Sequence, residues 1–237
     1  MRAELLKLRV LPTPRVIAAV AVVIGLLVAV GLAVDDPNDA VTYRDSALAA
    51  ATTVTSIASI LLGVWIVGVE YGQTTMRRVV AATPARPAVL AAKLTWLVAF
   101  VTLGTVAICA VGWAMAAAAG LVNGTNIPLH RFGVEVAATL VGNLPYAIVA
   151  FTVALLTRSM AGGITITLVL ALVVDTLLGA IPTVGDYTFG ASIGDVVGTI
   201  RGDHDAEMWG RGLAVTMGWL VVLSAASWLR FCRADVK

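Results

Sequence analysis

The sequence predicts an all-α polytopic membrane protein with six transmembrane helices. Of its 237 residues, 59% are hydrophobic and only 13% are charged, and the mean hydropathy of +0.95 lies outside the usual range of soluble domains. A bilayer core is about 30 Å thick, so a helix needs roughly 20 apolar residues to cross it. The predicted spans, which form a single transmembrane domain over residues 16–237, are 16–34, 46–69, 94–120, 133–156, 162–181 and 212–229.

Residues 1–15, which precede the first predicted span, mix charge and leucine at roughly helical spacing. Glu4, Lys7 and Arg9 carry the charges, and Pro12 breaks the pattern. A short helix along the cytoplasmic membrane surface fits this pattern, and a disordered basic tail is the alternative. The first span is predicted to be a retained anchor, because its apolar core is longer than that of a signal peptide and further spans follow.

The basic residues predict that both termini are cytoplasmic, since Lys and Arg are retained on that side of short loops. Twelve of the 16 Lys and Arg residues fall in segments that this orientation places inside. The four that fall outside are Arg44, Arg131, Arg201 and Arg211. The expected location is the plasma membrane of a bacterial cell, which is its inner membrane. A net charge of +2 gives no reason to expect a nucleic-acid partner.

A polar, basic segment from Glu70 to Lys93 connects the second and third predicted spans. Two helices can be joined by far fewer residues, so a further role is expected. The pattern predicts a helix over Tyr71–Ala82, with Glu70 opposing the positive end of its dipole and Pro84 ending it. The candidate residues of this segment are Glu70, Tyr71, Gln73, Thr74, Thr75, Arg77 and Arg78. The alternative is a solvated connector whose arginines only set the orientation of the chain in the membrane.

Span four contains Asn143 and Pro145, and span five contains Asp175. Proline removes a backbone hydrogen bond, which predicts a kink near Asn143 that either gates a pathway or only packs. A charged acid at the centre of a span is costly, by about 2.5–3.5 kcal/mol on insertion scales. Asp175 is therefore predicted either to serve a pathway or a dimer interface, or to reach the outer membrane surface. These three residues are the candidate pathway or gate.

The external stretch from Pro182 to Arg211 is unusually long and is not uniformly polar. Phe189, Ile193 and Val196 recur at helical spacing, which predicts a short amphipathic or re-entrant helix. A loop rich in glycine and aspartate is the alternative.

Together, an interfacial helix, six spans and the segment after span two resemble the type-2, exporter-class permeases of ABC transporters. The matching positions are Glu70, Tyr71, Thr75, Arg77, Pro84, Arg86 and Lys93; many members have glycine where this chain has Thr74. The resemblance implies that the segment is a coupling helix that docks on a cytoplasmic ABC ATPase subunit. It also implies a second permease copy, giving a homodimer or a heterodimer, and external helices that cap the pathway.

The sequence contains no Gly-x-x-x-x-Gly-Lys-Ser/Thr motif for a nucleotide phosphate. The chain itself is therefore not expected to be an enzyme or to hold a cofactor, and ATP and Mg²⁺ are expected in the partner ATPase. His130 and His204 have no Cys or His partner at metal-ligand spacing, so no metal site is predicted. The function expected is an ATP-driven exporter of a drug, lipid or peptide-like substrate. The alternative is an ATP-independent membrane protein, such as an ion-driven carrier or an immunity or signalling scaffold.

Overall fold

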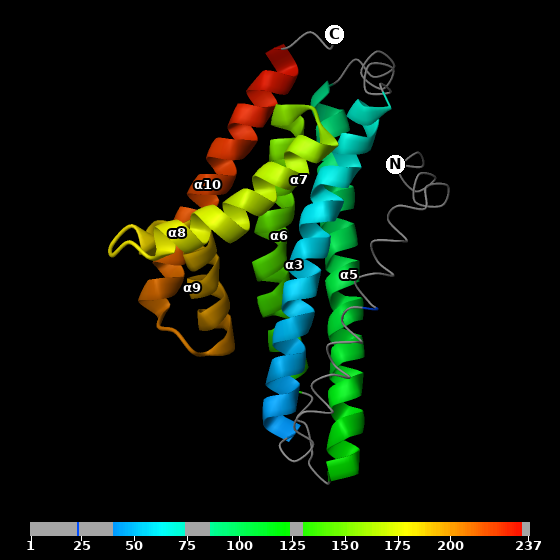
Figure 1. The fold of residues 1–237 in the computed structure, drawn as a ribbon, viewed down its shortest axis with the longest axis vertical. Helices are drawn as coiled ribbons and strands as arrows, with labels where there is room; N and C mark the ends of the chain where they lie inside the picture. The colour runs from blue at the N-terminus through cyan, green and yellow to red at the C-terminus, as the bar shows by residue number, and fades with distance from the viewer. Residues whose placement is uncertain (1–22, 24–39, 74–85, 124–129, 234–237) are drawn as a thin grey trace.

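The computed structural model describes residue 23 and residues 40–73, 86–123 and 130–233, and the elements in these ranges are helical (Figure 1). The long helices are α3 (Ala40–Gly72), α5 (Arg86–Asn123), α6 (His130–Thr157) and α10 (Ala206–Arg233). The shorter elements are α7 (Met160–Leu168), the π-helix η1 (Val169–Val174), α8 (Asp175–Gly179), the 3₁₀-helix η2 (Gly185–Tyr187) and α9 (Phe189–Arg201).

Five helical stretches within the described residues are long and apolar enough to cross a membrane. They are Val54–Gly72, Pro87–Ala114, Arg131–Thr157, Met160–Gly179 and Ala206–Arg233. The all-α fold class is confirmed for the described residues, and these five stretches coincide with predicted spans two to six. The predicted first span at 16–34 and the predicted helix at 1–15 lie outside the described residues. Helices α5 and α10 begin before their predicted spans, because polar residues extend a helix without adding to its apolar stretch.

Helices α3 and α6 form the centre of the molecule. Helix α3 packs along α6, while α5 and α7 contact both of them and α10 packs on α6 and α9. A Cβ atom at Gly63 would strike the backbone of Ala147, and Ala147 and Ala150 are fully buried. Small residues thus allow α3 and α6 to approach closely, as the composition of span two predicts.

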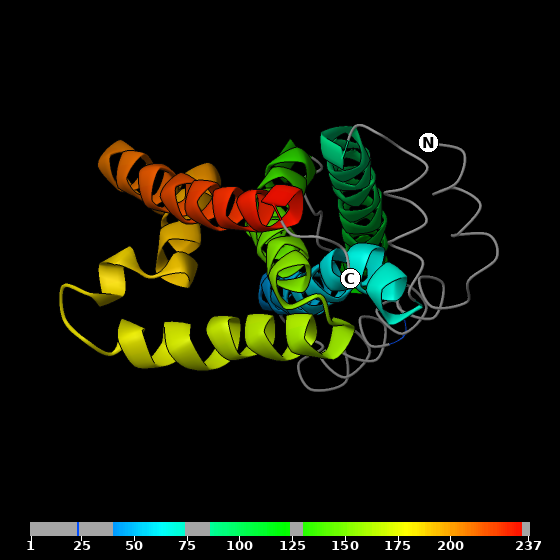
Figure 2. The ribbon, with the colours of Figure 1, turned by 90° about the horizontal axis from the view of Figure 1, so that it is seen from above.

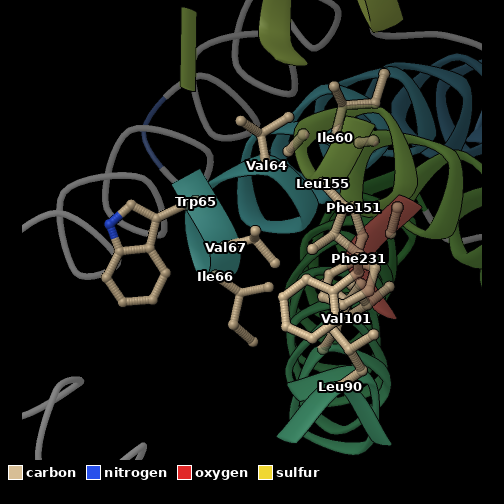
Figure 3. Packing of buried hydrophobic residues seen from close by; sticks show 14 residues of the cluster. Ile60, Val64, Trp65, Ile66, Val67, Leu90, Val101, Phe151, Leu155 and Phe231 are labelled. Atoms are coloured by element: carbon tan, nitrogen blue, oxygen red, sulfur yellow. The ribbon is translucent and has the colours of Figure 1, made fainter. Parts of the chain in front are cut away.

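A cluster of buried apolar side chains lies where α3, α5 and α6 meet (Figure 3). Val64 and Val67 of α3, Val101 of α5 and Phe151 of α6 belong to it, and Phe231 brings the end of α10 into the same cluster. In Figure 1 the ends of α3 and α10 and the start of α5 lie at the same end of the molecule.

The fifth span is divided, because the α-helix widens into a π-helix at Val169–Val174 before α8 begins with Asp175. Such π-segments are rare and occur frequently at functional sites. The chain then turns into α9, which lies between α8 and α10 (Figure 2). This is the helix predicted between Pro182 and Arg211. Ile193 and Val196 are buried on one of its faces.

Candidate functional site

A buried ion pair joins the end of α3 to the start of α5. Lys93 Nζ lies 2.7 Å from Glu70 Oε1, and the two side chains are only 2% and 3% exposed. The same ammonium donates to the carbonyl of Ile66, at 3.2 Å. The carbonyl end of a helix carries partial negative charge, which favours a cation there. Lys93 therefore neutralises the carboxylate and also stabilises the last turns of α3.

This placement corrects the predicted start of a helix at Tyr71, and residues 74–82 of that predicted helix lie outside the described residues. Glu70 and Tyr71 belong to the last turn of α3, and the Gln73 amide still donates to the Val69 carbonyl at 3.0 Å. Glu70 therefore lies at the negative end of a helix, where Lys93 offsets the unfavourable interaction, and the predicted favourable dipole contact is wrong. Thr74, Thr75, Arg77 and Arg78 lie outside the described residues, as do the candidate residues Glu4, Lys7 and Arg9 of the interfacial helix.

The connection between the two helices is also shorter than predicted. Helix α5 begins at Arg86, so Arg86 and Lys93 are helical, as is Pro87 in the first turn, where proline is tolerated. Only residues 74–85 separate the described parts of the two helices. The Glu70/Lys93 ion pair therefore lies close to both ends of the segment that carries Arg77 and Arg78.

Other charged groups gather near this end of the molecule. Tyr71 lies within electrostatic reach of Arg158, at the turn between α6 and α7, and of Arg230, in the last turns of α10. The sequence-based orientation assigns both arginines to the cytoplasmic side. The structure thus brings together basic groups from two further elements of the predicted cytoplasmic face.

Asn143 of span four is fully buried and connects two helices. The Ser56 hydroxyl of α3 donates to Asn143 Oδ1 at 2.7 Å. Helix α6 continues unbroken from His130 to Thr157 through Pro145. The structure therefore gives Asn143 a packing contact, and the kink and gate expected near Asn143 stay a prediction.

Asp175, the first residue of α8, is partly buried and contacts α6. Its Oδ2 atom lies 3.5 Å from the Tyr146 hydroxyl of α6, which donates to it. The N-terminus of α9 also lies close to this carboxylate, since a Cβ atom at Gly190 would be 2.8 Å from Asp175 Oδ2. A helix N-terminus carries partial positive charge, which favours an anion. Asp175 therefore connects span five to α6 and α9.

This contact depends on glycine at position 190. A Cβ atom there would lie 2.8 Å from Asp175 Oδ2 and 3.1 Å from the Tyr146 hydroxyl. The Tyr146 ring also packs edge-on against Phe189, with the ring centroids 5.2 Å apart. The absence of a side chain at Gly190 thus lets the N-terminus of α9 approach the carboxylate closely.

A cavity of about 340 Å³ borders Asp175. Its walls come from α6, the divided fifth span, the turn before α9, and α10, and are mostly apolar. The lining residues are Tyr146, Val149, Thr167, Leu170, Ala171, Val174, Asp175, Leu178, Val184, Tyr187, Thr188, Phe189, Trp219 and Leu223. Of the candidate pathway residues, only Asp175 lines this cavity; Asn143 and Pro145 do not.

Sequence reasoning missed a group of ion pairs around α9. Arg201 lies 3.0 Å from Glu135 of α6, and Arg211 of α10 lies 2.8 Å from Asp195. Asp195, Arg201 and Arg211 lie in the external stretch expected from the sequence and Glu135 lies near the start of predicted span four, but no spacing rule pairs them. The only available signal was that Asp195 interrupts an apolar helical pattern, which hints at a partner on a facing helix.

Comparisons of this chain with protein-family models and with curated proteins find no match.

Proposed function

We propose that this chain is the transmembrane permease subunit of an ATP-driven ABC exporter. In this proposal it pairs with a second permease, either a copy of itself or a related chain, and binds cytoplasmic ABC ATPase subunits. The ATPase subunits supply ATP and Mg²⁺ chemistry. The resemblance of residues 70–93 to a coupling segment motivates the proposal, and the buried Glu70/Lys93 ion pair is the single observation that supports it most.

The ion pair supports this function because of where it lies along the chain. An ATPase that moves a cytoplasmic segment does work on the membrane domain only if that segment is firmly connected to the spans. Lys93 contacts both the Glu70 carboxylate and the Ile66 carbonyl, so the end of α3 and the start of α5 are fixed to each other. A movement of residues 74–85 would then displace both helices together.

The proposed mechanism follows from this connection. ATP binding closes the pair of ATPase subunits and moves the docked segment that carries Arg77 and Arg78. Helices α3 and α5 move with it, and α6 follows because it packs closely on α3 at Gly63. The pathway then changes its access from one side of the membrane to the other.

The test is co-purification of the chain with an ABC ATPase encoded beside it, followed by ATP hydrolysis measurements in lipid nanodiscs. Reversal of both Arg77 and Arg78 to Glu is expected to abolish stimulation of hydrolysis and to leave the permease folded. Arg131→Glu is the matched control, since this exposed arginine begins the α6 span at the predicted external end. Normal coupling in the doubly reversed variant would refute the proposed docking role.

A second candidate, an ion-driven carrier, is favoured by one observation. Asp175 is an ionisable group within an apolar span, and it borders a cavity. Such acids often mark proton or ion pathways. Substrate uptake into proteoliposomes driven by a pH gradient without any ATPase would support this candidate against the exporter.

A further inference from the structure

We propose that the cavity beside Asp175 binds a lipophilic organic cation, a drug-sized molecule that carries an ammonium or other onium group. Its volume of about 340 Å³ falls in the range of small-molecule sites. The walls are almost entirely apolar, with few polar groups to orient a ligand. This is the usual composition of a site for a largely apolar molecule.

The charge of the cavity comes from Asp175. Within the part of the chain that the structure describes, no Lys, Arg or His nitrogen lies within 4.0 Å of its carboxylate. Its hydrogen-bond donor among these residues is the neutral Tyr146 hydroxyl, and the N-terminus of α9 lies beside it. A helix N-terminus compensates only about half an elementary charge. A bound cation would supply the rest in a region where water is scarce.

The aromatic residues of the cavity also favour a cation. Four rings line it, from Tyr146, Tyr187, Phe189 and Trp219. The face of an aromatic ring attracts a cation within about 6 Å of its centroid, most strongly where water is excluded. A carboxylate combined with several rings is a suitable environment for an ammonium or onium group.

One further polar group of the cavity lacks a partner. Thr167 is only 1% exposed, and its hydroxyl has no hydrogen-bond partner among the described residues. Buried polar atoms are rarely left in this state. An ammonium ligand with an N–H would satisfy it, whereas a quaternary onium ion would bind through the carboxylate and the rings alone.

The exposed residues at the edge of the cavity indicate how the ligand enters. Leu178 and Trp219 line the cavity, are 37% and 45% exposed, and belong to candidate membrane spans. In a bilayer this side faces lipid rather than water. The ligand therefore arrives from the membrane, which requires a lipophilic molecule. The proposed cation site depends only on the geometry and chemistry of the cavity. Its assignment as the site of the transported substrate rests on the proposed function.

The test measures binding of radiolabelled tetraphenylphosphonium to the chain in nanodiscs, with empty nanodiscs subtracted. We expect saturable binding of this cation and none of tetraphenylborate, which has nearly the same shape and the opposite charge. Asp175→Asn keeps the size and an acceptor oxygen, and should weaken cation binding at least tenfold. Asp203→Asn, at an exposed site outside the cavity, should leave binding unchanged.

Three results would overturn the proposal: no saturable binding, equal binding of the anion, or unchanged binding by folded Asp175→Asn. An azido derivative of the cation gives an answer without any variant. It should label peptides containing residues 167–178 and 184–189, and labelling confined to the exposed Val221 and Val222 side of α10 would contradict the site. Cation binding without any ATPase coupling would refute the exporter and leave this inference intact. ATPase coupling without cation binding would refute this inference and leave the exporter intact.

Discussion

Glu70 and Asp175 are both carboxylates on apolar helices, but the groups that surround them differ. Glu70 is buried against the ammonium of Lys93, at 2.7 Å. Among the residues that the structure describes, Asp175 accepts a hydrogen bond from the neutral Tyr146 hydroxyl and has no cationic partner within 4.0 Å, and it borders a cavity. Glu70 is also the more deeply buried of the two, since Asp175 is only partly buried. A cationic partner together with deep burial thus marks the structural acid, whereas the partly buried acid with a neutral donor is available to a ligand. The first forms a joint between two spans, and the second retains a charge that another molecule can neutralise.

The greatest loss of stability is expected when the Glu70/Lys93 ion pair is broken. Lys93→Met removes the cation and leaves the buried Glu70 carboxylate without it, which typically costs about 3–5 kcal/mol. The free energy of unfolding in mixed micelles measures this loss. Adding Glu70→Gln to Lys93→Met should restore part of it, because the buried charge that Lys93 neutralised is then gone. A loss below about 1 kcal/mol in the single variant would show that the pair is not a structural joint.

A smaller loss is expected where α3 packs on α6. Gly63→Ala places a methyl group against the backbone of Ala147, and overpacking of this kind costs about 1–3 kcal/mol. Gly104→Ala is the matched control, because a Cβ atom there meets nothing within 4 Å. The same unfolding measurement should place the control within about 1 kcal/mol of the wild type. Equal losses in both variants would contradict the close helix approach.

The environment of Asp175 can be altered without changing its charge. Gly190→Ala would place a methyl group 2.8 Å from Asp175 Oδ2, so the carboxylate must move. A displacement that costs about 1 kcal/mol would lower the affinity for tetraphenylphosphonium about fivefold. Gly194→Ala, on the same helix with nothing within 4 Å, should bind normally. If the two variants bind alike, the position of the carboxylate does not control binding.

The smallest loss of stability is expected at the more exposed Arg201/Glu135 ion pair. Arg201 and Glu135 have side chains that are 32% and 16% exposed, so water screens much of their attraction. Glu135→Gln should cost at most about 1 kcal/mol, and less at high salt. Unfolding at low and high ionic strength measures this. A loss as large as that of Lys93→Met would show that burial does not separate the two ion pairs.

The spans could be predicted from the sequence because an apolar run of sufficient length has few other stable environments. The same reasoning placed Asp175 within span five, at a position where a charge is costly. It also selected Glu70 and Lys93, but as separate members of one connecting segment. Hydropathy gives no register between helices, so it could not show that their side chains meet.

The surroundings of Asp175 could not be predicted for a related reason. They depend on α9 packing its N-terminus against α8 and α6, an arrangement set by long-range contacts of Gly190 and Tyr146. The Glu135 and Arg201 pair likewise joins residues that are 66 positions apart. Local patterns predicted that α9 exists and which face is apolar. They carried no information about its neighbours.

The most direct test of the contrast between the two carboxylates is a tetraphenylphosphonium binding isotherm for folded Asp175→Asn and folded Glu70→Gln, measured against the wild type. We expect at least a tenfold loss of affinity for Asp175→Asn and wild-type affinity for the folded fraction of Glu70→Gln. Equal affinities in the two variants, or a loss confined to Glu70→Gln, would contradict this expectation.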